Sequence, residues 1–151
     1  MSKKYLVAID GYDAGWKALD CAIEFAKATD ASLTVLHVVP YEPMPKGLEE
    51  FARIEGISLD EQNARYHYSK TLGDGITKEG EKRVRAAGLT QVETHVSEGS
   101  PAAEIASFAE GRSMDMVFVG NRGYGEFASR VLGSVSNGIL NPTHCTVVVV
   151  K

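Results

Sequence analysis

Apolar residues gather in short segments along the chain, and segments with helical periodicity separate them. Strands are predicted at residues 5–9, 33–39, 90–96, 116–119 and 145–150. All of these except the third, which alternates between apolar and polar residues, are continuous apolar runs, as in strands buried on both faces of a parallel sheet. Helices are predicted at residues 14–29, 60–87, 101–111 and 129–140. This regular alternation indicates a single α/β domain over residues 1–151, with helices on both faces of a parallel sheet in a three-layer α/β/α arrangement.

Local residue patterns refine three of these segments. Ser97-Glu98-Gly99 predicts a turn after the third strand. Ser100 followed by Pro101 predicts the start of a helix, with serine as N-cap and proline at the first helical position. The helix expected at residues 60–87 contains glycines that each cost about 1 kcal/mol relative to alanine, and a break near Gly73–Gly75 fits that pattern.

Composition and charge limit the classes of partner. The 151 residues carry a net charge of −4, so the chain has no general attraction for nucleic acids or anionic membranes. No apolar run reaches the roughly 20 residues that span a bilayer, and Met1–Tyr5 leads into a strand without the pattern of a signal peptide. Cys21 and Cys145 lie far apart and outside any CxxC pair, which disfavours a disulfide scaffold. We therefore expect a cytoplasmic protein.

A glycine-rich turn follows the fourth predicted strand. Gly120–Gly125 contains three glycines, and Gly133–Ser136 lies near the start of the last predicted helix. Glycine lets the backbone approach a ligand closely, and exposed amides together with a helix N-terminus bind phosphate. Arg122 adds a charge suited to phosphate oxygens. A glycine turn alone is equally compatible with simple chain geometry, but the second glycine-serine pair favours a phosphate site.

Asp10 directly follows the first predicted strand, in Ala8-Ile9-Asp10-Gly11. Ligands of open parallel sheets bind beyond the carboxyl ends of the strands, so Asp10 is a candidate ligand contact. The alternative is that Asp10 only caps the turn after the strand. His37 lies inside the second predicted strand and is expected to be a hydrogen-bonded core histidine. The remaining histidines have no ligand spacing, so no metal site is predicted from the side chains.

These features together resemble the universal stress protein family. Gly120-x-x-Gly123, nine further residues and then Gly133-Ser134 match that family's nucleotide signature, G-2x-G-9x-G-(S/T). The resemblance extends along the whole chain. The family's pattern also matches, in the same order, residues 8–10, 35–38, 99–105, 115–120 and 146–150.

The resemblance implies a fold, a ligand and an assembly. The family fold is an adenine-nucleotide alpha-hydrolase-like sheet of five parallel strands in the order 3-2-1-4-5, and members with this signature bind ATP. Homodimers commonly form through the last strand, here Cys145 to Val150. The residues carried over to the adenosine end of the site are Ala8, Ile9, Asp10 and Val38. Those carried over to the ribose and phosphates are Val119, Gly120, Arg122, Gly123, Gly133, Ser134, Val135 and Ser136.

Two departures from the family pattern leave this implication intact. Gly11-Tyr12-Asp13 replaces the small hydroxyl residue often seen after the aspartate, and Asn121 stands where serine is frequent. The chain also lacks a Walker lysine after the glycine turn and a GxSxG nucleophile elbow. We therefore assign no catalytic residue and expect slow ATP hydrolysis at most.

The leading hypothesis is a non-enzymatic ATP-binding stress-response protein that works as a homodimer. ATP would bind with or without Mg²⁺, and a protein partner, unidentified from the sequence, would respond to nucleotide state. A first alternative is a slow ATPase or adenylate-transferring enzyme. A second is an interaction module that binds AMP, cyclic AMP or no nucleotide.

Overall fold

Five parallel strands form one sheet in the order β3-β2-β1-β4-β5. The computed structural model describes residues 2–40, 53–54, 61–121, 138–140 and 142–151. The strands are β1 (Lys4–Ala8), β2 (Ser32–Pro40), β3 (Val92–Gly99), β4 (Met116–Gly120) and β5 (Thr146–Val150). The expected order and the parallel arrangement are confirmed.

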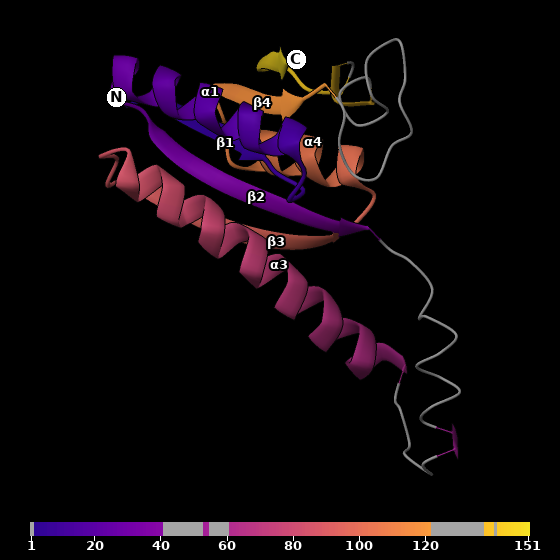
Figure 1. Cartoon of the computed structure of the whole chain (residues 1–151). Coiled ribbons are helices and arrows are strands. Elements are labelled where there is room, and N and C mark those ends of the chain that lie inside the picture. The colour runs from indigo at the N-terminus through magenta and orange to yellow at the C-terminus, as the bar shows by residue number, and fades with distance from the viewer. Residues whose placement is uncertain (1, 41–52, 55–60, 122–137, 141) are drawn as a thin grey trace.

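Helices cover both faces of this sheet (Figure 1). The long helices are α1 (Asp13–Thr29), α3 (Glu61–Ala86) and α4 (Pro101–Gly111). Helices α1 and α3 pack on one face and α4 on the other, because their buried residues belong to two separate apolar clusters. Residues 53–54 and 138–140 are also helical; the rest of the helix predicted at 129–140 lies outside the described residues. No helix in the described part of the chain is both long and apolar enough to cross a membrane.

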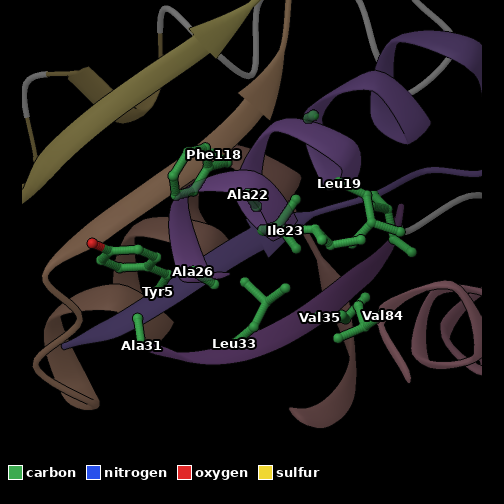
Figure 2. Packing of buried hydrophobic residues seen from close by; sticks show 13 residues of the cluster. Tyr5, Leu19, Ala22, Ile23, Ala26, Ala31, Leu33, Val35, Val84 and Phe118 are labelled. Carbon is green, nitrogen blue, oxygen red and sulfur yellow. The ribbon is translucent and has the colours of Figure 1, made fainter. Parts of the chain in front are cut away.

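The apolar stripe of α1 forms the centre of the larger cluster. Its inward residues recur at helical spacing and are buried, namely Ala18, Leu19, Ala22, Ile23 and Ala26. Figure 2 shows this stripe against the sheet, with Phe118 of β4 near Tyr5 of β1 and Val84 of α3 beside Val35 of β2. The rings of Tyr5 and Phe118 lie 5.7 Å apart, within the range of favourable aromatic pairs. This packing fixes α1 over β1 and β4.

Two local predictions were wrong. Ser97–Gly99 is not a turn but the end of β3, because β2 extends to Pro40 and pairs with β3 along its whole length, up to Pro40 opposite Gly99. Helix α3 runs unbroken through Gly73–Gly75. A Cβ atom at Gly73 would lie 2.5 Å from Val96 Cγ1, so glycine lets the helix approach β3 closely. The tertiary contact offsets the low helix propensity of glycine.

Helix α4 begins as predicted, with Pro101 in its first turn and Ser100 as N-cap. The Ser100 side chain makes no capping hydrogen bond. The backbone carbonyl of Ser100 instead accepts a bond from the N–H of Glu104 at 2.9 Å.

Candidate functional site

The carboxyl ends of β1 and β4 lie side by side at the centre of the sheet. Strand β1 is hydrogen-bonded to β2 on one side and to β4 on the other, with Val7 opposite Phe118. The chain leaves β1 towards β2 and reaches β4 only after β3, so the strand order reverses between β1 and β4. Ligands of open α/β sheets bind at such a reversal, beyond the carboxyl ends of the strands. Asp10 and Gly120, the two candidates named from these strand ends, flank this point.

Asp10 lies in the turn between β1 and α1, and it is only 8% exposed. Its Oδ1 accepts a hydrogen bond from the backbone N–H of Tyr12 at 2.9 Å. A Cβ atom at Gly15 would lie 2.6 Å from the same oxygen, so Gly15 makes room for the carboxylate against the first turn of α1. The capping role considered for Asp10 is therefore confirmed, and a ligand contact remains a prediction.

Gly120 also packs against the first turn of α1. A Cβ atom there would lie 2.7 Å from the carbonyl oxygen of Ala14. Glycine is thus required for close packing at this strand end, whatever the ligand. Ala14 contacts Gly120, and its neighbour Gly15 contacts Asp10. The start of α1 therefore contacts both strand ends.

Four other predicted site residues have side chains in the core. Val38 lies two positions beyond the level of Ala8, because Ala8 pairs with Leu36 in the parallel register. The exposed fractions are 3% for Ala8, 0% for Ile9, 0% for Val38 and 2% for Val119. Ile9 packs in the cluster under α1, and the other three pack in the cluster under α4. These side chains therefore hold the strand ends in place through the apolar core on the two faces of the sheet.

His37 confirms the prediction of a hydrogen-bonded core histidine. It is 3% exposed, and its Nδ1 lies 2.7 Å from the carbonyl oxygen of Ile9. Because a carbonyl only accepts, Nδ1 donates this bond. Burial lowers the pKa of His37, against the opposing effects of the Ile9 carbonyl and the nearby Asp10 carboxylate. Burial therefore favours the neutral imidazole, and its hydrogen bond to Ile9 fixes the end of β1 next to Asp10.

Contacts to the turn after β1 were not anticipated from the sequence. Gly11 has a φ of +87°, a conformation that strongly favours glycine. Its carbonyl oxygen accepts a hydrogen bond from Trp16 Nε1 at 3.2 Å, and the guanidinium of Arg83 lies 4.0 Å from the centre of the Trp16 ring. The Asp-Gly pair at the strand end signals a turn, but the residues that hold it come from two helices.

The other half of the predicted site lies outside the described residues. It comprises Arg122, Gly123, Gly133, Ser134, Val135 and Ser136. Within the described ranges, no group of three or more histidine, cysteine, aspartate or glutamate side chains is placed to hold a metal ion. The described half thus offers a buried carboxylate, a glycine turn and two strand ends.

Comparison with known proteins assigns the family. The model of the universal stress protein family matches residues 1–151. Universal stress protein YxiE of Bacillus subtilis is 32% identical over 157 residues, with 100% of each chain covered. Among solved structures, the hypothetical protein MJ0577 superposes with a TM-score of 0.78 at 22% identity, covering 100% of this chain and 96% of the other. A universal stress protein in complex with cAMP has a TM-score of 0.67 at 25% identity, covering 99% and 96%. The chain belongs to the universal stress protein family.

Proposed function

We propose that this chain is an ATP-binding stress-response protein that binds the nucleotide without turning it over appreciably. The observation that carries the proposal is the position of the split glycine signature. Its first glycine, Gly120, ends β4 beside the Asp10 turn, where open parallel sheets bind ligands. The rest of the signature, Gly123 and Gly133-Ser134, follows Gly120 in the sequence.

The proposed site divides the nucleotide between the two strand ends. Asp10 is suited to a ribose hydroxyl, because a carboxylate after an early strand commonly accepts such bonds in nucleotide-binding sheets. Gly123, Gly133 and Ser134 would present backbone and hydroxyl donors to the phosphates, and Arg122 would add charge. Mg²⁺ would bind mainly through phosphate oxygens and water, as this ion does in many nucleotide sites.

Isothermal calorimetry with ATP and Mg²⁺, on protein stripped of bound nucleotide, tests the proposal. We expect saturable one-site binding that Gly123→Val abolishes, since a branched side chain would block close approach of the phosphates. Gly111→Val is the matched control, because a Cβ atom at Gly111 has no neighbour within 4 Å. Absence of binding up to about millimolar ATP would reject the proposal, as would equal binding by the Gly123 variant. A millimolar dissociation constant corresponds to a binding free energy of about −4 kcal/mol.

A cyclic or monophosphate nucleotide is the second candidate ligand. It is favoured by the related universal stress protein that was solved in complex with cAMP. The same calorimetric cell, filled in turn with ATP, AMP and cAMP, ranks the three ligands. Tighter binding of cAMP than of ATP would transfer the proposal to the cyclic nucleotide. Steady release of ADP or AMP that Asp10→Ala removes would instead support the slow ATPase or adenylate-transferring alternative.

The proposed assembly is a homodimer through the last strand. In the described part of the chain, β5 is an end strand of the sheet, and its four valines are partly exposed. An exposed apolar edge strand favours association with another copy. A nucleotide-dependent surface of this dimer would then recruit a protein partner in the cytoplasm.

A further inference from the structure

The turn that carries Asp10 is held by α3 as well as by α1. A Cβ atom at Gly11 would lie 3.3 Å from Ile76 Cδ1, and one at Gly80 would lie 3.0 Å from Ile9 Cδ1. Ile76 and Gly80 are four residues apart and therefore lie on one face of α3. The residues on both sides of Asp10 thus pack against the same helix face.

Trp16 extends this contact to the backbone of the turn. Its indole Nε1–H donates to the carbonyl oxygen of Gly11 at 3.2 Å. The guanidinium of Arg83 lies 4.0 Å from the ring centre, a geometry that gives a favourable cation–π interaction. Arg83 is oriented by Glu79, with Nε 3.1 Å from Oε1. Arg83 lies three residues after Gly80, so it continues the same face of α3.

The backbone freedom of Gly11 gives this anchor a role. At a φ of +87° it occupies one of several backbone conformations that glycine adopts with similar ease. A turn that samples other conformations binds a ligand only in the fraction of time it spends in the competent one. The hydrogen bond from Trp16 favours one orientation of the Gly11 carbonyl, next to the Asp10 carboxylate.

We propose that Trp16 is a positioning residue of the nucleotide site, and that its stacking with Arg83 makes nucleotide affinity depend on the docking of α3. This inference rests on the proposed nucleotide binding at Asp10 and adds a regulatory connection to it. Coupling between two parts of a protein is reciprocal. A nucleotide that holds the Asp10 turn therefore also strengthens the contact between Trp16 and α3.

Trp16 is the only tryptophan in the chain, so its fluorescence reports this contact directly. Titration of the stripped protein with ATP and Mg²⁺ is expected to change the emission of Trp16. The midpoint of that change should coincide with the midpoint measured by calorimetry. A residue with a purely structural role would keep the same emission in the free and the bound protein.

Two variants separate the hydrogen bond from the stacking. Trp16→Phe removes the N–H donor but retains an aromatic ring, and it should weaken ATP binding about two- to tenfold, the worth of one hydrogen bond. Arg83→Met removes the cation and should weaken binding about two- to fivefold. Arg85→Met is the matched control, because Arg85 forms a comparable pair with Glu81 at 2.9 Å on the same helix.

The possible outcomes are distinguishable. Wild-type affinity in both Trp16→Phe and Arg83→Met, or emission that saturating ATP leaves unchanged, overturns the inference and leaves ATP binding intact. A loss of affinity in Arg85→Met as large as in Arg83→Met also overturns it. Absence of ATP binding by the wild-type protein in calorimetry rejects the proposed function, and the inference with it. Arg83 is 40% exposed, so its replacement tests the inference even if Trp16→Phe does not fold.

Discussion

At the scale of single residues, the described half of the site depends on glycines, where any side chain would collide with a neighbouring residue. Gly15 leaves space for the Asp10 carboxylate, and Gly120 lets the end of β4 touch the backbone of Ala14. A glycine in a nucleotide signature is usually attributed to close approach of the ligand. At Gly120, however, packing against Ala14 already requires glycine in the protein without any ligand. Its replacement should therefore affect folding as well as binding.

We predict that Gly120→Ala destabilises the protein. The new Cβ atom would lie 2.7 Å from the carbonyl oxygen of Ala14, and backbone at that distance must move. Overpacking of this kind typically costs about 1–3 kcal/mol. Urea unfolding would measure the loss. Gly111→Ala is the control, because its Cβ atom would contact nothing within 4 Å; equal stability of the two variants would contradict the packing role of Gly120.

His37 gives a second prediction at this scale, on pH dependence. Burial lowers its pKa in the folded protein, whereas the unfolded chain binds the proton below about pH 6.5. Between those two pKa values the unfolded state holds more protons, so the free energy of unfolding falls as the pH drops through this window. Below the folded pKa, His37 contributes no further change. Each unit of pKa lowering is worth about 1.4 kcal/mol.

Replacement of His37 by asparagine isolates this effect. An asparagine amide can donate to the Ile9 carbonyl, which His37 Nδ1 contacts at 2.7 Å, but it does not titrate. Chemical unfolding at about pH 7.5 and about pH 5.5 should show a smaller acid-induced loss in His37→Asn than in the wild type. The same loss in both proteins would assign the pH dependence to other groups.

At the scale of elements, the sequence predicts what is local and misses what depends on a partner. The strands β1, β2, β4 and β5 and the helices α1 and α4 are recognisable because periodicity and apolar runs lie within each segment. The end of β3 is not, because Ser97–Gly99 is extended only through its pairing with β2. The continuity of α3 is also not local, since its glycines are offset by contacts with the sheet.

The two glycines Gly75 and Gly80 of α3 should respond in opposite directions to alanine. A Cβ atom at Gly75 meets nothing within 4 Å, so Gly75→Ala should raise the free energy of unfolding by up to about 1 kcal/mol through helix propensity. At Gly80 it would lie 3.0 Å from both Ile9 Cδ1 and Val35 Cγ1. Both neighbours are fully buried, so Gly80→Ala should lower stability. Thermal unfolding of the two variants measures both shifts, and stabilisation of both would mean that the Gly80 contact relaxes without cost.

At the scale of the whole molecule, topology places the site. The strand order 3-2-1-4-5 puts β1 beside β4, and two residues 110 positions apart in the sequence, Asp10 and Gly120, then both contact the first turn of α1. Alternation of strands and helices predicts a parallel sheet, but the order of its strands was expected only through the family resemblance. The support from Trp16, Arg83 and Ile76 could not be predicted, because no local pattern states which face of α3 meets the turn.

The edge of β5 that pairs with no strand in the described part of the chain gives the last prediction, on assembly. The N–H of Thr146 and the carbonyl of Val150 bond the β4 side, to Asp115 and Asn121 respectively. Backbone groups alternate in direction along a strand, so the N–H of Val147 points away from β4, towards the edge where a second copy would dock. Val147→Pro removes that donor and keeps the ladder to β4 intact, since proline is tolerated at edge positions.

We expect light scattering at micromolar concentration to give a dimeric mass for the wild type and a monomeric mass for Val147→Pro. Thr94→Pro is the matched control on the opposite edge of the sheet. The N–H of Leu33 bonds Gln91 in front of β3, so by the same alternation Thr94 directs its N–H outward. It should remain dimeric. A dimer in Val147→Pro and a monomer in Thr94→Pro would place the interface on β3. A monomeric wild type would reject the proposed assembly, because the edge of β5 would then face solvent without association.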